Sequence, residues 1–209
     1  MKFLLLFFLF FSVACYADEL KKDETRNYSV RVFAGFSSAS DFDELYTFTG
    51  LNKSPYNTNV LGVDGGYRLV RDMFGLPVDI YAKGGLSYFD ENYHQADFLE
   101  MTLYLKLFIK LNLFDNQFRV GIGEGVSYAG RVPYTEAQEA IRENDNQSNF
   151  LNYMEITVDF DIGKLIRVDS MRDYHLGYLI KHRSGIHGLY GGVYDGGSNY
   201  NCIYVEKNF

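Results

Sequence analysis

The 209-residue chain has 20 basic and 27 acidic residues, and its formal net charge of −7 argues against a nucleic-acid partner. The length suits one domain rather than two. Tyr and Phe number 18 each and Gly 20, while Pro numbers only 3. This balance favours β-structure, and the mean hydropathy of −0.17 excludes a helical membrane protein.

The first residues have the three regions of a secretory signal. Met1 and Lys2 precede an apolar run over 3–13 and small residues over 14–17. The run is shorter than the roughly 18 residues of a membrane-spanning helix. We therefore expect a signal peptide at 1–17 and a mature domain over 18–209. Removal of one basic residue gives a charge of −8, and the one remaining cysteine cannot form an internal disulfide.

Eight segments alternate with a period of two and are predicted to be β-strands. They span 28–36, 60–68, 78–88, 99–112, 118–128, 153–162, 175–184 and 200–209. The fourth is the clearest, because its odd positions, such as Leu103, are apolar and several even positions, such as Lys106, are charged or polar. Each strand thus has one apolar face and one that is polar or rich in glycine.

Such alternation fits a soluble sandwich or lipocalin-like barrel with its apolar face inward, or a membrane barrel with that face outward. Several segments reach ten residues or more, whereas soluble strands average about 5–6 and tilted membrane strands need about 9–11. The opposite face carries small and ionic residues, such as Asp64 and Lys83, that suit a narrow barrel interior. We predict an all-β, eight-stranded antiparallel up-and-down transmembrane β-barrel in the bacterial outer membrane.

The connections support this topology because they are of two kinds. The mostly longer, polar ones are predicted to be extracellular, and they span 37–59, 89–98, 129–152 and 185–199. The mostly shorter ones are predicted to be periplasmic, and they span 69–77, 113–117 and 163–174. Residues 135–144 have helical propensity, which predicts a short helix in the third extracellular loop.

Candidate chemistry lies at the end of the seventh strand. His182 and Ser184 are two residues apart and share the apolar face, so a base and a hydroxyl lie close together at the extracellular rim. Neutral histidine can accept the serine proton during attack on an ester. Backbone N–H groups of the following loop, at Gly185 and Gly192, could form an oxyanion hole. The alternative is that these are rim residues meeting lipopolysaccharide head groups, and Arg183, of opposite parity, is predicted to form an interior salt bridge.

The sequence KHRSG at 181–185, the sequence GGSN at 196–199 and the final Phe209 resemble the outer-membrane lipid A deacylase (PagL-like, acyloxyacyl hydrolase) family over roughly thirty residues. The resemblance implies that Ser184 is the nucleophile and His182 the general base, in an active site outside the barrel. Its implied substrate is lipid A or lipopolysaccharide, and no metal or cofactor is expected.

The resemblance also calls for a glutamate near the start of the last strand, and no glutamate is present there. The nearest candidates are Asp195, in the loop, and Asn199, at the edge of the strand. Parity places Asn199 on the lipid-facing side, so we predict that it lies opposite His182 and orients the imidazole. An amide cannot offset the charge of an imidazolium, so we expect modest activity.

Other polar residues give weaker signals. Glu124 falls on the nominally lipid-facing side, which places it at the rim or requires a bulge that turns it inward. We expect His187 to be a solvated loop residue, and His94 and His175 lack metal-ligand spacing. The alternative function is a non-enzymatic structural or adhesion barrel that binds through loops 37–59 and 129–152. The sequence leaves open whether the barrel forms a homodimer.

Overall fold

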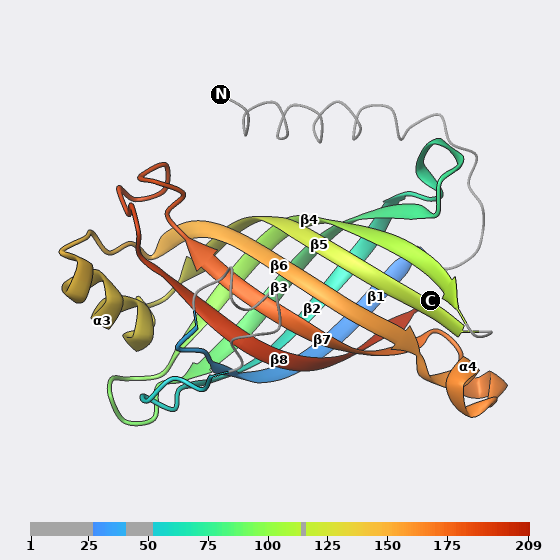
Figure 1. Ribbon diagram of the computed structural model, residues 1–209, viewed down its shortest axis with the longest axis horizontal. Coiled ribbons are helices and arrows are strands. Elements are labelled where there is room, and N and C mark those ends of the chain that lie inside the picture. Colours follow the sequence, from blue (N-terminus) through green and yellow to red (C-terminus); the bar gives the residue numbers. More distant parts are fainter. Residues whose placement is uncertain (1–26, 41–51, 114–115) are drawn as a thin grey trace.

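The computed structural model describes residues 27–40, 52–113 and 116–209, and the predicted signal peptide at 1–17 lies outside these residues. Eight strands, each antiparallel to the next and the last paired with the first, form a closed barrel (Figure 1). The strands are β1 Tyr28–Ser37, β2 Asn59–Val70, β3 Val78–Asp90, β4 Phe98–Leu113, β5 Asn116–Ala129, β6 Phe150–Asp161, β7 Tyr174–Ser184 and β8 Gly197–Asn208. The predicted eight-stranded up-and-down architecture is therefore confirmed.

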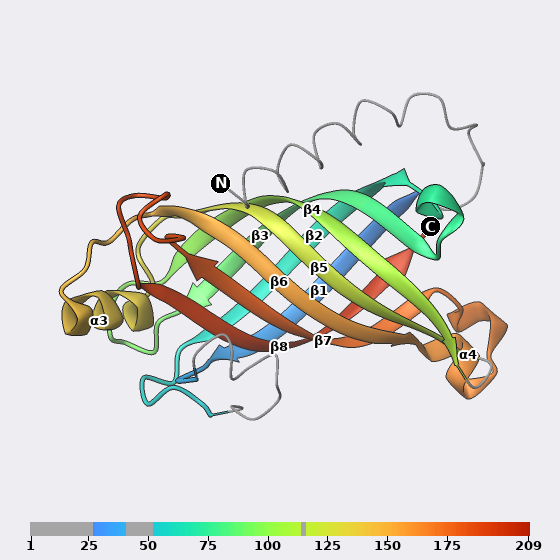
Figure 2. The same cartoon turned by 45° about the horizontal axis from the view of Figure 1, so that its top comes forward.

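Helical segments occur only in the connections among the described residues. They are α3 Tyr134–Glu143, α4 Ile162–Ile166 and the 3-10 segments η2 Met73–Gly75 and η3 Asp169–Met171. α3 confirms the helix expected in the third long loop, and it lies at the opposite end of the barrel from α4 and the C-terminus (Figure 2). No described helix is both long enough and apolar enough to cross a bilayer.

One end of β6 differs from the expectation. Ile162 was predicted to end this strand, but it begins α4 instead. The physical reason is a helix cap, because the Asp161 side chain accepts a hydrogen bond from Lys164 N at 2.9 Å. The sequence pattern could not show this, since Ile162 continues the apolar alternation.

The two faces of the sheet separate apolar from charged side chains as the alternation predicts. Outward side chains such as Leu103 and Ile203 are 66% and 68% exposed, whereas inward Tyr104 and Glu206 are buried. The outward apolar band follows all eight strands. This is the arrangement of a barrel whose outer surface contacts lipid.

Charged side chains in ion pairs fill the barrel interior. A layer of aromatic side chains lies between these pairs and the end of the barrel where α3 lies. Ion pairs join Arg31 to Asp64 and Glu155, and further pairs involve Lys83, Lys106, Arg119, Asp159 and Glu206. Towards the α3 end, Phe89 stacks on Phe98 with ring centroids 4.8 Å apart. Glycine makes space for such groups, because a Cβ on Gly62 would lie 2.2 Å from the Phe33 ring. The charged side chains that are buried in the interior therefore lie in ion pairs.

Candidate functional site

Consecutive side chains at the C-terminal end of β7 point to opposite faces of the barrel wall. Arg183 is buried inside the barrel, with its Nε 3.6 Å from a carboxylate oxygen of Glu136 and 4.0 Å from one of Glu100. The interior salt bridge predicted for Arg183 is thus present. His182 and Ser184, of the other parity, lie on the outer face and are partly exposed.

His182 is directly opposite Asn199 in the β7–β8 ladder, as parity predicts. The imidazole Nδ1 lies 2.7 Å from Asn199 Oδ1, and Asn199 Nδ2 donates to the carbonyl oxygen of Ser40 at 3.1 Å. That second bond fixes the amide, because only its nitrogen can donate to a carbonyl. The amide oxygen therefore faces the ring, so Nδ1 carries the hydrogen and Nε2 carries the lone pair. This is the tautomer that a general base requires.

The imidazole of His182 lies close to Gly197 in β8. Gly197 is the β8 partner of Ser184, and a Cβ on it would lie 3.6 Å from His182 Cε1 and 2.3 Å from the Arg183 carbonyl oxygen. The ring therefore extends from Asn199, at Nδ1, over the residue paired with Ser184. The base and the hydroxyl that sequence reasoning selected share one small area of the outer face.

The β7–β8 loop holds the other predicted candidates in different surroundings. Asp195 is exposed, and its backbone N–H donates a hydrogen bond to Asp145 Oδ2 at 2.8 Å. Gly185 is buried against Val193, whose carbonyl oxygen would lie 1.9 Å from an added Cβ. Gly192 has a φ of +69° and its carbonyl accepts from Asn146 at 2.7 Å. Their roles in an oxyanion hole remain predictions.

Two predicted histidine environments can be compared with the structure. His187 is exposed in the loop, with a φ of +51°. His175 lies inside the barrel, with Nδ1 3.0 Å from Asp159 Oδ1. Across residues 27–40, 52–113 and 116–209, no three His, Cys, Asp or Glu side chains gather to hold a metal ion.

Glu124 lies on the outer face of β5, so of the two expected arrangements the bulge that turns it inward does not occur. The register continues without a shift on both sides, from Leu105 through Glu124 to Met154, so no bulge reorients it. Its carboxylate accepts a hydrogen bond from the side chain of Asn152. Sequence reasoning missed Asn152 because the residue was assigned to the preceding loop, whereas β6 begins at Phe150.

A polar cavity lies at the α3 end of the barrel and has Asn199 in its lining. It has a volume of about 460 Å³ and is bounded by the β1–β2 connection, α3 and the start of β8. Ser40, Ser54, Thr135 and Gln138 line it together with Asn199. Asn199 thus both contacts His182 and lines the cavity.

Comparison with known proteins gives a likeness in fold. No protein-family model and no curated protein sequence matches the chain. Among solved structures, it is similar to the outer membrane enzyme PagL, with a TM-score of 0.54 and 9% identity over 87% of this chain and 99% of that one. Neisserial surface protein A gives 0.48 and 12% over 87% and 97%, and the N-terminal β-barrel domain of Pseudomonas aeruginosa OprF gives 0.44 and 10% over 88% and 98%. What is shared is the eight-stranded barrel.

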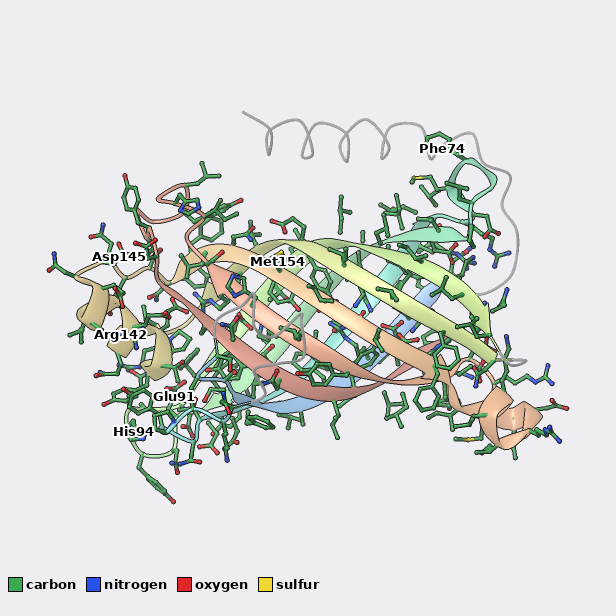
Figure 3. All side chains as sticks on the ribbon, viewed as in Figure 1. Phe74, Glu91, His94, Arg142, Asp145 and Met154 are labelled. Atoms are coloured by element: carbon green, nitrogen blue, oxygen red, sulfur yellow. The ribbon has the colours of Figure 1, made fainter. Side chains whose placement is uncertain are left out.

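The carboxylate of Asp145, just after α3, binds the β7–β8 loop, and Figure 3 shows this residue at the α3 end of the barrel. Asp145 Oδ2 accepts backbone N–H groups of Tyr194, Asp195 and Gly196 at 2.8, 2.8 and 3.1 Å. These donors, with that of Asp195 first, lower the pKa of Asp145 from its usual value. The contact is therefore fully present at neutral pH and weakens only as pH falls below about 4.

Replacing Asp145 by alanine is expected to loosen this loop at neutral pH. Hydrogen exchange of a peptide containing 194–196 should become faster, because three backbone N–H groups lose their acceptor. The matched control is Glu143→Ala, an exposed acid at the end of α3, which should leave that exchange unchanged. Equal protection in Asp145→Ala and the parent protein would show that other contacts hold the loop.

Proposed function

We propose that this protein is an exported outer-membrane esterase that removes an ester-linked acyl chain from lipid A or a similar outer-leaflet lipid. The observation that carries the proposal is the imidazole of His182, held by Asn199 in the tautomer of a general base, on the same outer face as Ser184. The outward apolar band supports membrane insertion, because such a surface is stable against acyl chains. A hydrolytic pair on that surface meets a lipid substrate.

In the proposed reaction, Ser184 Oγ attacks the ester carbonyl carbon while its proton passes to His182 Nε2. The carbonyl electron pair moves onto oxygen, and N–H donors near Ser184 stabilise the oxyanion. Its collapse breaks the ester bond, and the leaving alcohol takes the proton from His182. Water, activated by the same imidazole, then hydrolyses the acyl-serine and releases the fatty acid. Asn199 holds the ring throughout.

The surroundings suit a lipid with a polar head. Its acyl chains would lie along the apolar outer face of β6 and β7, and its head would lie towards the 460 Å³ cavity that adjoins Asn199. The hydroxyl and amide groups of that cavity, from Ser40, Ser54 and Gln138, can form hydrogen bonds with a hydroxyl-rich head group.

The proposal is tested with purified protein in detergent and lipid A. Mass spectrometry should detect lipid A that has lost one acyl chain, together with the free fatty acid, and heat-unfolded protein should yield neither. Unchanged lipid A in both samples would favour the alternative, a non-enzymatic structural or adhesion barrel. The observation that favours this alternative is the amide at Asn199, which cannot offset the imidazolium charge as a carboxylate can.

The role of Asn199 is open to a direct comparison of variants. Asn199→Ala should lower turnover of lipid A by about tenfold or more, because the imidazole loses the partner that fixes its tautomer. Asp195→Ala should lower turnover less, since its carboxylate is on the exposed loop. Both are measured with purified protein at saturating lipid A. The reverse order would transfer the orienting role to Asp195.

A further inference from the structure

The outer face beside Ser184 carries a second polar pair that the proposed hydrolysis has not used. Asn152, on β6, is the ladder partner of Ser184 on the side away from Gly197. Its side-chain amide donates a hydrogen bond to Glu124 on β5. The site therefore continues across three strands beyond β8, from β7 through β6 to β5.

These groups are placed where polar side chains are unfavourable. An acidic side chain on the lipid-facing side of a strand costs free energy unless it is paired or hydrogen-bonded. Ionisable residues at such positions are commonly functional. Asn152 is only 3% exposed. The β7–β8 loop contributes to the surroundings, because Tyr190 packs near Phe150 with ring centroids 5.8 Å apart and interacts electrostatically with Glu124. The amide is thus held in a place from which water is largely excluded.

Glu124 does not occupy the position of the missing carboxylate. In the ladder, Met154 stands between Glu124 and His182. Met154 lies on the outer surface of the barrel in Figure 3. Glu124 instead bonds to Asn152, so its influence reaches Ser184 through that amide.

We infer that Asn152 donates a hydrogen bond to the oxyanion formed at Ser184, and that Glu124 is the positioning residue for the Asn152 amide. Residues opposite each other in a ladder have Cβ atoms about 4.5–5.5 Å apart. This distance brings the Asn152 amide within reach of the oxyanion on the carbonyl carbon that Ser184 attacks. A primary amide has two N–H groups. Glu124 accepts one, and we assign the other to the oxyanion.

This assignment places the two catalytic functions on opposite sides of Ser184. The base approaches from β8, where Asn199 holds His182, and the oxyanion donor approaches from β6. The scissile carbonyl would then lie between β6 and β7, with its oxygen towards Asn152. An amide fixed in advance in a site with little water is an effective donor, since it need not reorganise during the reaction.

The inference rests on the proposed esterase activity, and kinetics on the purified full chain in detergent, with lipid A as substrate, separate the two. Asn152→Ala is expected to lower kcat by about 10²- to 10³-fold with KM changed by less than about twofold, because the donor acts on the transition state. Asn152→Leu, which keeps side-chain volume and suits a lipid-facing surface, should lose as much. Asn116→Ala removes another buried, hydrogen-bonded amide, at the far end of the barrel, and should leave kcat unchanged.

Glu124 is tested by a conservative and a disruptive change. Glu124→Gln retains an oxygen that accepts from Asn152 and should stay within about threefold of the parent kcat, whereas Glu124→Leu should lower kcat about tenfold or more by misplacing the amide. A parent protein that is active while both Asn152 variants keep more than a third of its kcat would overturn the inference and leave the esterase standing. A parent without activity would overturn the proposed function, and the inference with it.

Discussion

Lipid A from cells that produce the Ser184→Ala variant is expected to keep all its acyl chains, while lipid A from cells that produce the parent protein lacks one. The reason is that alanine removes the oxygen that would attack the ester, and loss of the nucleophile from a serine–histidine pair lowers turnover on the order of 10⁴- to 10⁶-fold. The fold should be unaffected, because Ser184 lies at the end of β7 and its replacement removes one partly exposed oxygen. Mass spectrometry of extracted lipid A makes the comparison.

A matched serine controls for damage to the barrel. Ser127, on β5, is buried in the interior, where its hydroxyl donates to Glu100 at 2.6 Å. Ser127→Ala should therefore alter stability slightly and leave deacylation as in the parent protein. Identical lipid A in Ser184→Ala and parent cells would end the assignment of Ser184 as nucleophile, and absence of deacylation in every strain would favour the binding barrel.

Arg31→Met is expected to lower the free energy of unfolding by about 3–5 kcal/mol. Arg31 is fully buried, and its guanidinium lies 2.6 Å from Asp64, 2.7 Å from Glu155 and 2.8 Å from the hydroxyl of Tyr104. Methionine fills much of the volume of the arginine side chain. It removes, however, the positive charge that lies beside two buried carboxylates. Lys106 and Lys83 remain as partners and limit the loss.

Unfolding in urea, followed by circular dichroism in detergent, measures this effect. The exposed pair of Arg172 with Asp169 provides the control, since Arg172→Met should change stability by less than about 0.5 kcal/mol. The double variant Arg31→Met with Glu155→Gln should recover part of the loss, because it removes one of the uncompensated charges. A change below about 1 kcal/mol in Arg31→Met would show that the two lysines suffice for both carboxylates.

The sequence alone was sufficient to predict the eight strands, to within a few residues at their ends, and the faces of their side chains. Alternation is a property of single segments, because successive side chains of a strand point to opposite faces. It therefore indicated that Arg183 points inward and that His182 and Ser184 point outward. Parity in β8 also placed Asn199 on the face of His182, and antiparallel pairing of the last two strands made it possible for the two residues to lie opposite each other.

Only the tertiary structure decided which groups meet across strands and loops. The Asn199 amide is fixed by Ser40, which is 159 positions away in the sequence, and the β7–β8 loop is held by Asp145 of the preceding long loop. The Asn152–Glu124 bond depends on the exact start of β6, which the alternation placed three residues late. Such contacts follow from register and closure of the whole barrel, and a local pattern with a period of two contains no information about them.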